Sequence, residues 1–186
     1  MVRERCCSCF QCVQACANTA LQVAGYEVAV PELIAILLRD RAYFDASGGG
    51  VTLSGGEPSF QAEFAAQLAG RLRENRVHVA LDTCGQGPWD ALASIVSSTD
   101  LVLFDIKLAE STRLREYTGA NWPLVLANLD RVLASGTDVV IRFPLVPGLN
   151  DDHEHLNAVG AVLRERNIHS IDVIPYAGLP VTSTSQ

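Results

Sequence analysis

Residues 50–57 read GVTLSGGE, and this stretch is informative about the fold, because a short apolar run ends there in a turn of small and acidic residues. Four later stretches repeat the design: VHVALDTCG at 77–85, DLVLFDIK at 100–107, DVVIRFPLVPG at 138–148 and IDVIPYAG at 171–178. Short, nearly continuous apolar runs are typical of parallel strands that are buried on both faces. The sequence therefore predicts five such strands.

Amphipathic helical patterns fill the intervals between these strands. Apolar residues recur there at the spacing of a helix face, in three sets: Phe60, Phe64, Leu68 and Leu72; Val125, Leu129, Val132 and Leu133; Leu156, Val159, Val162 and Leu163. An earlier helix is predicted to begin at residues 30–32, with Pro31 in its first turn. The alternation of strands and helices predicts an α/β fold with mostly parallel strands and right-handed crossovers, arranged as a sheet or a barrel.

Polar residues follow each strand at its carboxyl end. In parallel α/β folds, ligands bind at this end because the strand-to-helix loops converge there. Paired glycines let a ligand approach the backbone, carboxylates bind an ammonium group or ribose hydroxyls, and Lys or Arg binds a carboxylate. The predicted ligand is zwitterionic, such as an amino-acid derivative. The candidate residues are Ser54, Gly55, Gly56, Glu57, Asp82, Thr83, Asp105, Lys107, Arg142 and Tyr176.

Cysteine residues crowd the beginning of the chain. Cys6, Cys9, Cys12 and Cys16 follow the spacing C-x2-C-x2-C-x3-C, which bacterial ferredoxins use to bind iron–sulfur clusters. A zinc site with four thiolates is the rival interpretation, although zinc ligands usually form two separated pairs. The spacing favours an iron–sulfur site. In two-cluster ferredoxins the fourth cysteine of a run binds the other cluster, so this single run is half of such a loop.

Composition restricts the class of protein. The chain has 186 residues, of which 48% are hydrophobic, and this predicts one soluble domain. A net charge of −7 argues against nucleic acid as a partner, and no apolar stretch has transmembrane length. Reduced cysteines without an export signal predict a cytoplasmic location. His153 and His155, on either side of Glu154, are expected to face solvent in a first helical turn and not to bind metal.

Six stretches carry a family resemblance, in the order SGGGVTLSGGEP, LDTCG, LVLFDIK, YTGAN, RFPLVPGLNDD and VIPY. They resemble the activating enzymes of glycyl radical enzymes, the group of pyruvate formate-lyase activase within the radical S-adenosylmethionine (SAM) superfamily. The resemblance extends from Cys6 to Tyr176. It implies a partial (β/α) barrel of the radical SAM type at residues 26–180 and a partial ferredoxin-like loop at 1–25. The small polar tail at 181–186 is expected to be frayed.

The resemblance also implies how the strand-end residues act. The Gly-Gly-Glu turn matches the turn that holds the methionyl amine of SAM, and Lys107 matches a contact to its carboxylate. Asp82, Thr83 and Asp105 match positions that line the SAM pocket, and Arg142 matches a strand-end residue near SAM. The residues implied to bind SAM are Ser54, Gly55, Gly56, Glu57, Asp82, Thr83, Asp105, Lys107 and Arg142.

The implied reaction is the reductive cleavage of SAM at a [4Fe–4S] cluster. The resulting deoxyadenosyl radical takes a hydrogen atom from a backbone glycine of a partner enzyme. The implied cofactors are therefore a [4Fe–4S] cluster and SAM. The implied partners are a glycyl radical enzyme and an electron donor such as flavodoxin or ferredoxin, and the chain itself is expected to be a monomer.

The sequence also departs from the family pattern. The catalytic signature C-x3-C-x2-C is absent, since Thr19 stands where a third cysteine would follow Cys12 and Cys16. Ala177 replaces the histidine that the family places after Tyr176. We expect the first barrel strand and the SAM-binding cluster to be missing, and the chain to be inactive alone. The alternatives are a non-catalytic iron–sulfur module for electron transfer or binding, and an inactive domain with a structural zinc site.

Overall fold

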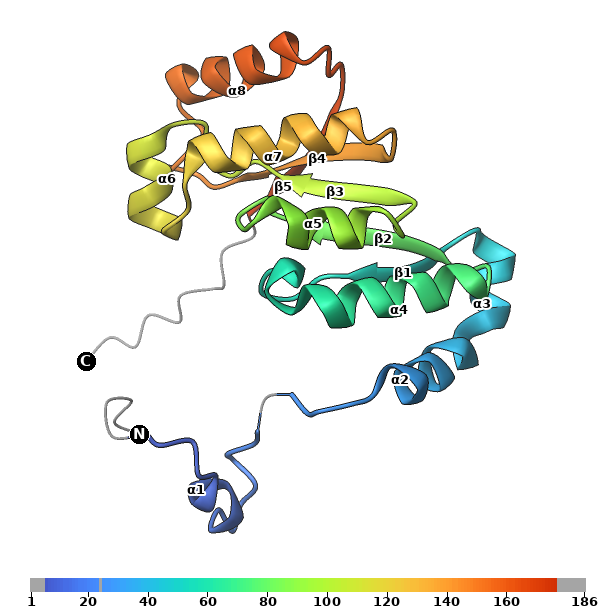
Figure 1. The fold of residues 1–186 in the computed structure, drawn as a ribbon. Coiled ribbons are helices and arrows are strands. Elements are labelled where there is room, and N and C mark those ends of the chain that lie inside the picture. Colours follow the sequence, from blue (N-terminus) through green and yellow to red (C-terminus); the bar gives the residue numbers. More distant parts are fainter. Residues whose placement is uncertain (1–5, 24, 177–186) are drawn as a thin grey trace, which may run out of the picture.

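The computed structural model describes residues 6–23 and 25–176, and its centre is one five-stranded sheet (Figure 1). The strands lie in the order of the sequence, and all four neighbouring pairs are parallel. The strands are β1 (Gly50–Leu53), β2 (His78–Thr83), β3 (Leu101–Asp105), β4 (Asp138–Leu145) and β5 (Ile171–Pro175). The predicted α/β partial barrel with five strands is confirmed, and the sheet is not closed.

Helices and short turns connect the strands and precede the first one. They are α1 (Gln11–Gln14), α2 (Val30–Leu37), η2 (Leu38–Asp40), α3 (Arg41–Ser47), η3 (Pro58–Gln61), α4 (Ala62–Glu74), α5 (Trp89–Val96), α6 (Ser111–Thr118), α7 (Trp122–Ala134) and α8 (His153–Glu165). None of the helices in the described ranges has the length and apolar run needed to cross a membrane. The predicted frayed tail at 181–186 and Ala177 lie outside the described residues.

Several helices begin where the sequence supplies a cap for free backbone N–H groups. The Asn121 side chain accepts a hydrogen bond from the backbone N–H of Leu124, and the Asp152 side chain accepts one from that of His155. Such caps satisfy donors that have no partner inside the helix. Pro31 lies in the first turn of α2, as predicted.

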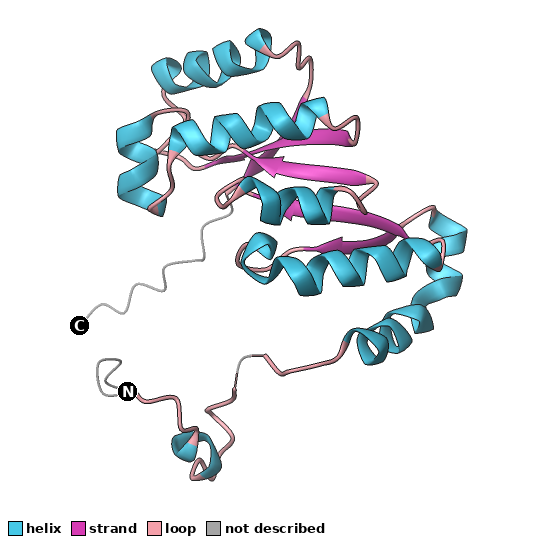
Figure 2. Ribbon diagram, viewed as in Figure 1, coloured by secondary structure: helices cyan, strands magenta, loops and turns pink. Residues whose placement is uncertain are grey.

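The helices α4, α5 and α7 cover one face of the sheet (Figure 2). Side chains alternate between the two faces along a strand. Residues such as Val79, Leu81 and Phe104 therefore pack under the helices and are fully buried. Their neighbours Asp82 and Asp105 belong to the opposite face. This alternation directs the charged side chains at the strand ends away from the core.

Three predictions about helix faces are wrong, and one of them concerns Leu156 of α8, which is 40% exposed. Phe60 is 78% exposed, because it lies in η3, a turn that begins at Pro58, and not in the packed stripe of α4. His155 is only 3% exposed and stacks on Phe143, with ring centroids 6.0 Å apart. His155 precedes the buried Val159 by four residues, so both lie on the inner face of α8.

Candidate functional site

A network of charged side chains crosses the carboxyl ends of four strands. The Ser54 hydroxyl donates to Asp82 Oδ2 (2.9 Å), and Arg142 Nη1 lies 3.1 Å from the same oxygen. Arg142 Nε lies 3.3 Å from Asp105 Oδ1, while Lys107 Nζ lies 3.1 Å from Asp105 Oδ2. The structure thus brings together five of the residues that the sequence predicts as a site.

Two buried atoms in this network have no hydrogen-bond partner. They are Asp105 Oδ1 and Arg142 Nε, which form an ion pair at 3.3 Å without hydrogen-bond geometry. The Asp105 side chain is 13% exposed and that of Arg142 is 24% exposed. A buried polar atom without a partner costs free energy, so the network retains capacity for further polar contacts. Asp172 faces Arg142 in the pairing of β4 with β5.

Glu57 lies on the other side of β2 from this network. Its carboxylate accepts hydrogen bonds from the Thr83 hydroxyl (2.8 Å), the Cys84 backbone N–H (2.9 Å) and the Ser59 backbone N–H (3.3 Å). The Cys84 thiol donates a further bond of 3.1 Å. Thr83 and Asp82 are consecutive in the strand, so their side chains point to opposite faces. Glu57 therefore fixes the Gly-Gly-Glu turn to the end of β2.

The turn itself leaves open space beside its two glycines. A Cβ atom added at Gly55 or Gly56 would meet no atom within 4 Å. Gly55 has a φ of +121°, which is accessible to glycine at little cost. This turn can admit a ligand close to the backbone, as the sequence predicts.

The loop after β2 is held by a residue that sequence reasoning missed. Asn128 of α7 is fully buried, and its Nδ2 donates to the carbonyls of Gly85 (2.8 Å) and Gly87 (3.0 Å). The signal in the sequence is an amide three residues after Val125 on an apolar helix face. Burial, with the Glu57 carboxylate beside it, raises the pKa of the Cys84 thiol in this loop.

The identity of Lys107 is a further signal in the sequence for this charged network. Lys107 is the only lysine among the 186 residues, and every other cationic side chain apart from histidine is arginine. An ammonium group is a compact point charge, whereas a guanidinium is a planar fork. The charged network therefore contains the one position where the chain uses lysine.

The cysteine run does not form a metal site in the described residues. Cys6, Cys9 and Cys12 are exposed and Cys16 is half-buried. Among residues 6–23 and 25–176, no three His, Cys, Asp or Glu side chains gather as a metal site. A hydrogen bond from the Gln11 backbone and one from Cys7 lower the pKa of Cys9. The cluster at these four cysteines stays a prediction, as does the boundary between residues 25 and 26.

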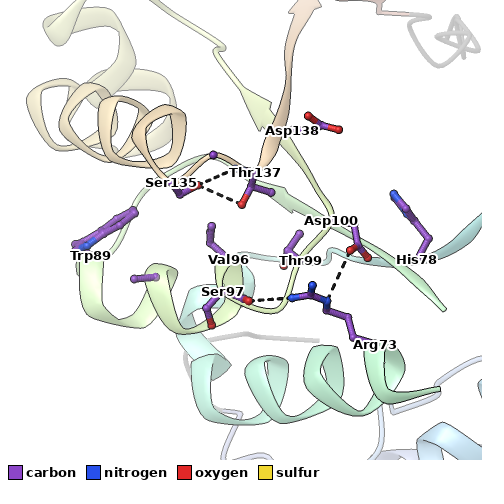
Figure 3. A pocket seen from close by; sticks show the side chains of 12 residues that line it. Arg73, His78, Trp89, Val96, Ser97, Thr99, Asp100, Ser135, Thr137 and Asp138 are labelled. Atoms are coloured by element: carbon purple, nitrogen blue, oxygen red, sulfur yellow. Dashed lines mark hydrogen bonds and ion pairs between the residues drawn. The ribbon is translucent and has the colours of Figure 1, made fainter. Parts of the chain in front are cut away.

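A cavity lies at the opposite, amino-terminal end of the strands (Figure 3). It encloses about 750 Å³ and is lined by side chains that include His78 and Asp138, the first residues of β2 and β4. Arg73 is engaged by Asp100 at 3.7 Å and by the Ser97 carbonyl at 3.1 Å. The cavity contains none of the predicted site residues.

Comparisons with known proteins identify the family of this chain. The sequence model of the radical SAM superfamily matches residues 10–159. The isethionate sulfite-lyase activating enzyme of Nitratidesulfovibrio vulgaris is 36% identical over 94% of this chain and 57% of its own length. The pyruvate formate-lyase 2-activating enzyme of Escherichia coli K12 is 36% identical over 92% of this chain and 59% of its own length. The chain thus spans less than two thirds of these relatives.

Solved structures place the fold in the same group. A domain of the pyruvate-formate lyase-activating enzyme from Bacteroides vulgatus is 28% identical with a TM-score of 0.58, over 68% of this chain and 76% of that chain. Streptococcus suis SuiB bound to S-adenosylmethionine has a TM-score of 0.68 at 14% identity, over 86% of this chain and 36% of that chain, and shows the fold alone. Activating enzymes of the superfamily use a [4Fe–4S] cluster and SAM. The match over most of its length shows that this chain belongs to the radical SAM superfamily.

Proposed function

We propose that this chain binds the amino-acid part of SAM at the strand-end network, as part of a glycyl-radical-enzyme activating enzyme. The observation that carries the proposal is the joining of Ser54, Asp82, Asp105, Lys107 and Arg142 by contacts of 2.9 to 3.3 Å. The relatives are named as activating enzymes of lyases and dehydratases, which supports a glycyl radical enzyme as the partner. The electron donor is proposed to be a flavodoxin or ferredoxin.

The residues fit a zwitterionic ligand in charge and in space. Lys107 and Arg142 supply two cations, and Lys107 keeps 42% of its side chain exposed at the rim of the network. We assign the ligand carboxylate to Lys107 and the ligand ammonium group to the open turn at Gly55 and Gly56. Asp105, which is paired with both cations, holds them in place in this assignment.

The negative charge of Glu57 suggested a contact to the ligand ammonium group, but in this proposal Glu57 has a structural role. Four donors already surround its carboxylate, so it would hold the glycine turn in shape and would not itself bind the ammonium group. Replacing these bonds with a ligand contact would leave the donors of Thr83 and Cys84 without a partner.

The chemistry of the bound group depends on residues that the 186-residue sequence does not contain. SAM bound to a reduced [4Fe–4S] cluster supplies the radical that acts on the partner enzyme. The sequence has no C-x3-C-x2-C run for that cluster. We therefore propose that this chain, by itself, binds SAM without cleaving it.

Binding of SAM to two charge-matched variants tests the proposal. Lys107→Gln removes one positive charge from the network, and Arg73→Gln removes one from the opposite end of the sheet. A charge-assisted contact contributes about 1.5–3 kcal/mol, so Lys107→Gln is expected to weaken SAM binding by about tenfold or more. Arg73→Gln is expected to leave it unchanged. Isothermal titration calorimetry with SAM measures both.

Two results would contradict the proposal. One is that the unaltered chain and Lys107→Gln bind SAM with equal affinity. This result would mean that the charged network does not contact SAM. The other is an equal loss in both variants, which would point to a general effect of net charge.

A further inference from the structure

The buried side chain of Asn150 joins the ends of two strands. Asn150 lies in the loop between β4 and α8 and is 1% exposed. Its Nδ2 donates to the carbonyls of Lys107 (2.9 Å) and Pro144 (2.8 Å), and its Oδ1 accepts from the Val146 backbone N–H (2.7 Å). All three partners are backbone groups. One amide therefore ties the segment after β3 to the end of β4 and the loop that follows.

This connection holds the backbone at the root of the Lys107 side chain. The preceding residue, Ile106, donates its N–H to the Arg142 carbonyl (2.9 Å) and extends the ladder between β3 and β4. Asn150 then binds the Lys107 carbonyl itself. The Lys107 side chain is a flexible four-carbon stem whose ammonium group pairs with Asp105. The position of this ammonium group therefore depends on how firmly the Lys107 backbone is held.

The loop that carries Asn150 is itself fixed from a third element. Arg113 of α6 donates to the Leu149 carbonyl and lies 3.2 Å from Asp152 Oδ2. Asp152 in turn caps α8 through the His155 N–H. The loop that carries Asn150 is therefore held in place by α6 and α8. Through its side-chain amide, Asn150 in turn restricts the backbone of Lys107.

We infer that Asn150 is a positioning residue that sets Lys107 for the carboxylate of the ligand. The inference rests on the proposed function, in which Lys107 binds that carboxylate. Asn150 acts through the Lys107 backbone and does not touch the ligand. Its loss should therefore remove the part of the binding that depends on the carboxylate and spare the rest.

Two ligands that differ only in the carboxylate separate this role from a general structural one. The unaltered chain is expected to bind SAM about tenfold or more tightly than decarboxylated SAM, because Lys107 has no anion to bind in the latter. Asn150→Asp places an oxygen where Nδ2 faced two carbonyls and keeps the acceptor for Val146. This variant is expected to bind SAM only as weakly as the unaltered chain binds decarboxylated SAM. Its affinity for decarboxylated SAM is expected to stay the same. Titration calorimetry of each pair measures the difference.

The single lysine gives a second, ligand-free readout. Acylation by an amine-reactive reagent, followed by peptide mass spectrometry, reports on Lys107 alone once the peptide with the terminal amine is set aside. We expect Lys107 to react several-fold faster in Asn150→Asp and in the smaller Asn150→Ala. Asn128→Asp is the matched control, because Asn128 also donates to two backbone carbonyls but contacts neither Lys107 nor Asp105. It is expected to leave the Lys107 rate unchanged.

The outcomes separate the inference from the function on which it rests. An equal loss of affinity for both ligands in Asn150→Asp, or no loss for either, would overturn the inference and leave the proposed function standing. A Lys107 rate that rises equally in Asn128→Asp would also overturn it. If the unaltered chain did not distinguish SAM from decarboxylated SAM, the carboxylate contact and the inference would fall together. Should Asn150→Asp not fold, Asn150→Ala is judged by the same criteria.

Discussion

Gly85, at the scale of a single residue, is fixed by two independent constraints. Its φ is +69°, in the left-handed region, and a Cβ atom built on it would overlap the Phe104 ring. Gly119 has nearly the same φ, +73°, but a Cβ atom there would meet nothing within 4 Å. The two glycines therefore separate the cost of the backbone conformation from the cost of a steric clash.

Gly85→Ala is expected to lower the free energy of unfolding by about 2–4 kcal/mol, from the left-handed backbone and overpacking together. Gly119→Ala is expected to cost only the backbone part, about 1–2 kcal/mol. Urea denaturation of both variants measures the difference. Equal costs would mean that the Phe104 ring moves aside freely.

Residues that act through the backbone were the hardest to predict from the sequence. Charged residues at strand ends identify themselves, because a parallel sheet brings those ends together. Asn128 and Asn150 bind carbonyl groups of distant loops, and no local pattern records where those carbonyls lie. The direction of Glu57 was likewise set by Thr83 and Cys84, which the chain brings close only on folding.

Helix α8 packs through a titratable residue, which gives this element a dependence on pH. Burial, with the nearby Arg113, lowers the pKa of His155 below its usual value of about 6.5, while Asp152 and Glu110 act in the opposite direction. The Nε2 atom of His155 is buried without a hydrogen-bond partner. The folded chain therefore favours the neutral form of this imidazole.

The sign of the effect follows from proton linkage. Above about pH 6.5 His155 is neutral in both states and its packing contributes fully. As pH falls through 6.5 toward the lower pKa of the folded state, the unfolded chain binds a proton that the folded chain does not, so stability is lost. His155→Gln is expected to lose less free energy of unfolding than the unaltered chain when the pH falls from 7.5 to 5.5. Urea denaturation at both pH values measures this loss.

His153→Gln is the control on the same helical turn, since His153 is exposed. It should keep the loss of stability seen in the unaltered chain. If His153→Gln and His155→Gln reduced the loss equally, burial of His155 would not be its cause.

The strands were predicted well, and the faces of some helices were not. Continuous apolar runs identify buried parallel strands directly, and all five were found. A helical pattern gives a stripe but does not say where the stripe ends. Phe60 lies in the turn that begins at Pro58 and so does not join the apolar stripe of α4. His155 contacts Phe143 and so lies on the buried face of α8.

The whole molecule combines an ordered strand-end site with a sequence that spans 57–59% of the relatives compared with it. The proposed contacts to the amino-acid part of SAM lie at the carboxyl-end side of β1 to β4 or in the segments that directly follow β1 and β3. Under the proposed function, binding and cleavage would be separable in this chain, because they would depend on different residues. The first depends on the sheet, and the second on a cysteine motif absent from the 186 residues.

After anaerobic reconstitution with iron and sulfide and reduction by dithionite, the chain is expected to bind SAM and to form no 5′-deoxyadenosine. Liquid chromatography with mass spectrometry detects this product, and the Escherichia coli pyruvate formate-lyase 2-activating enzyme serves as the positive control. The Lys107→Gln variant sets the background, because it is expected to bind SAM poorly. Product above that background in the unaltered chain would show that the four-cysteine run at residues 6–16 can itself support cleavage, and would contradict the separation of the two steps.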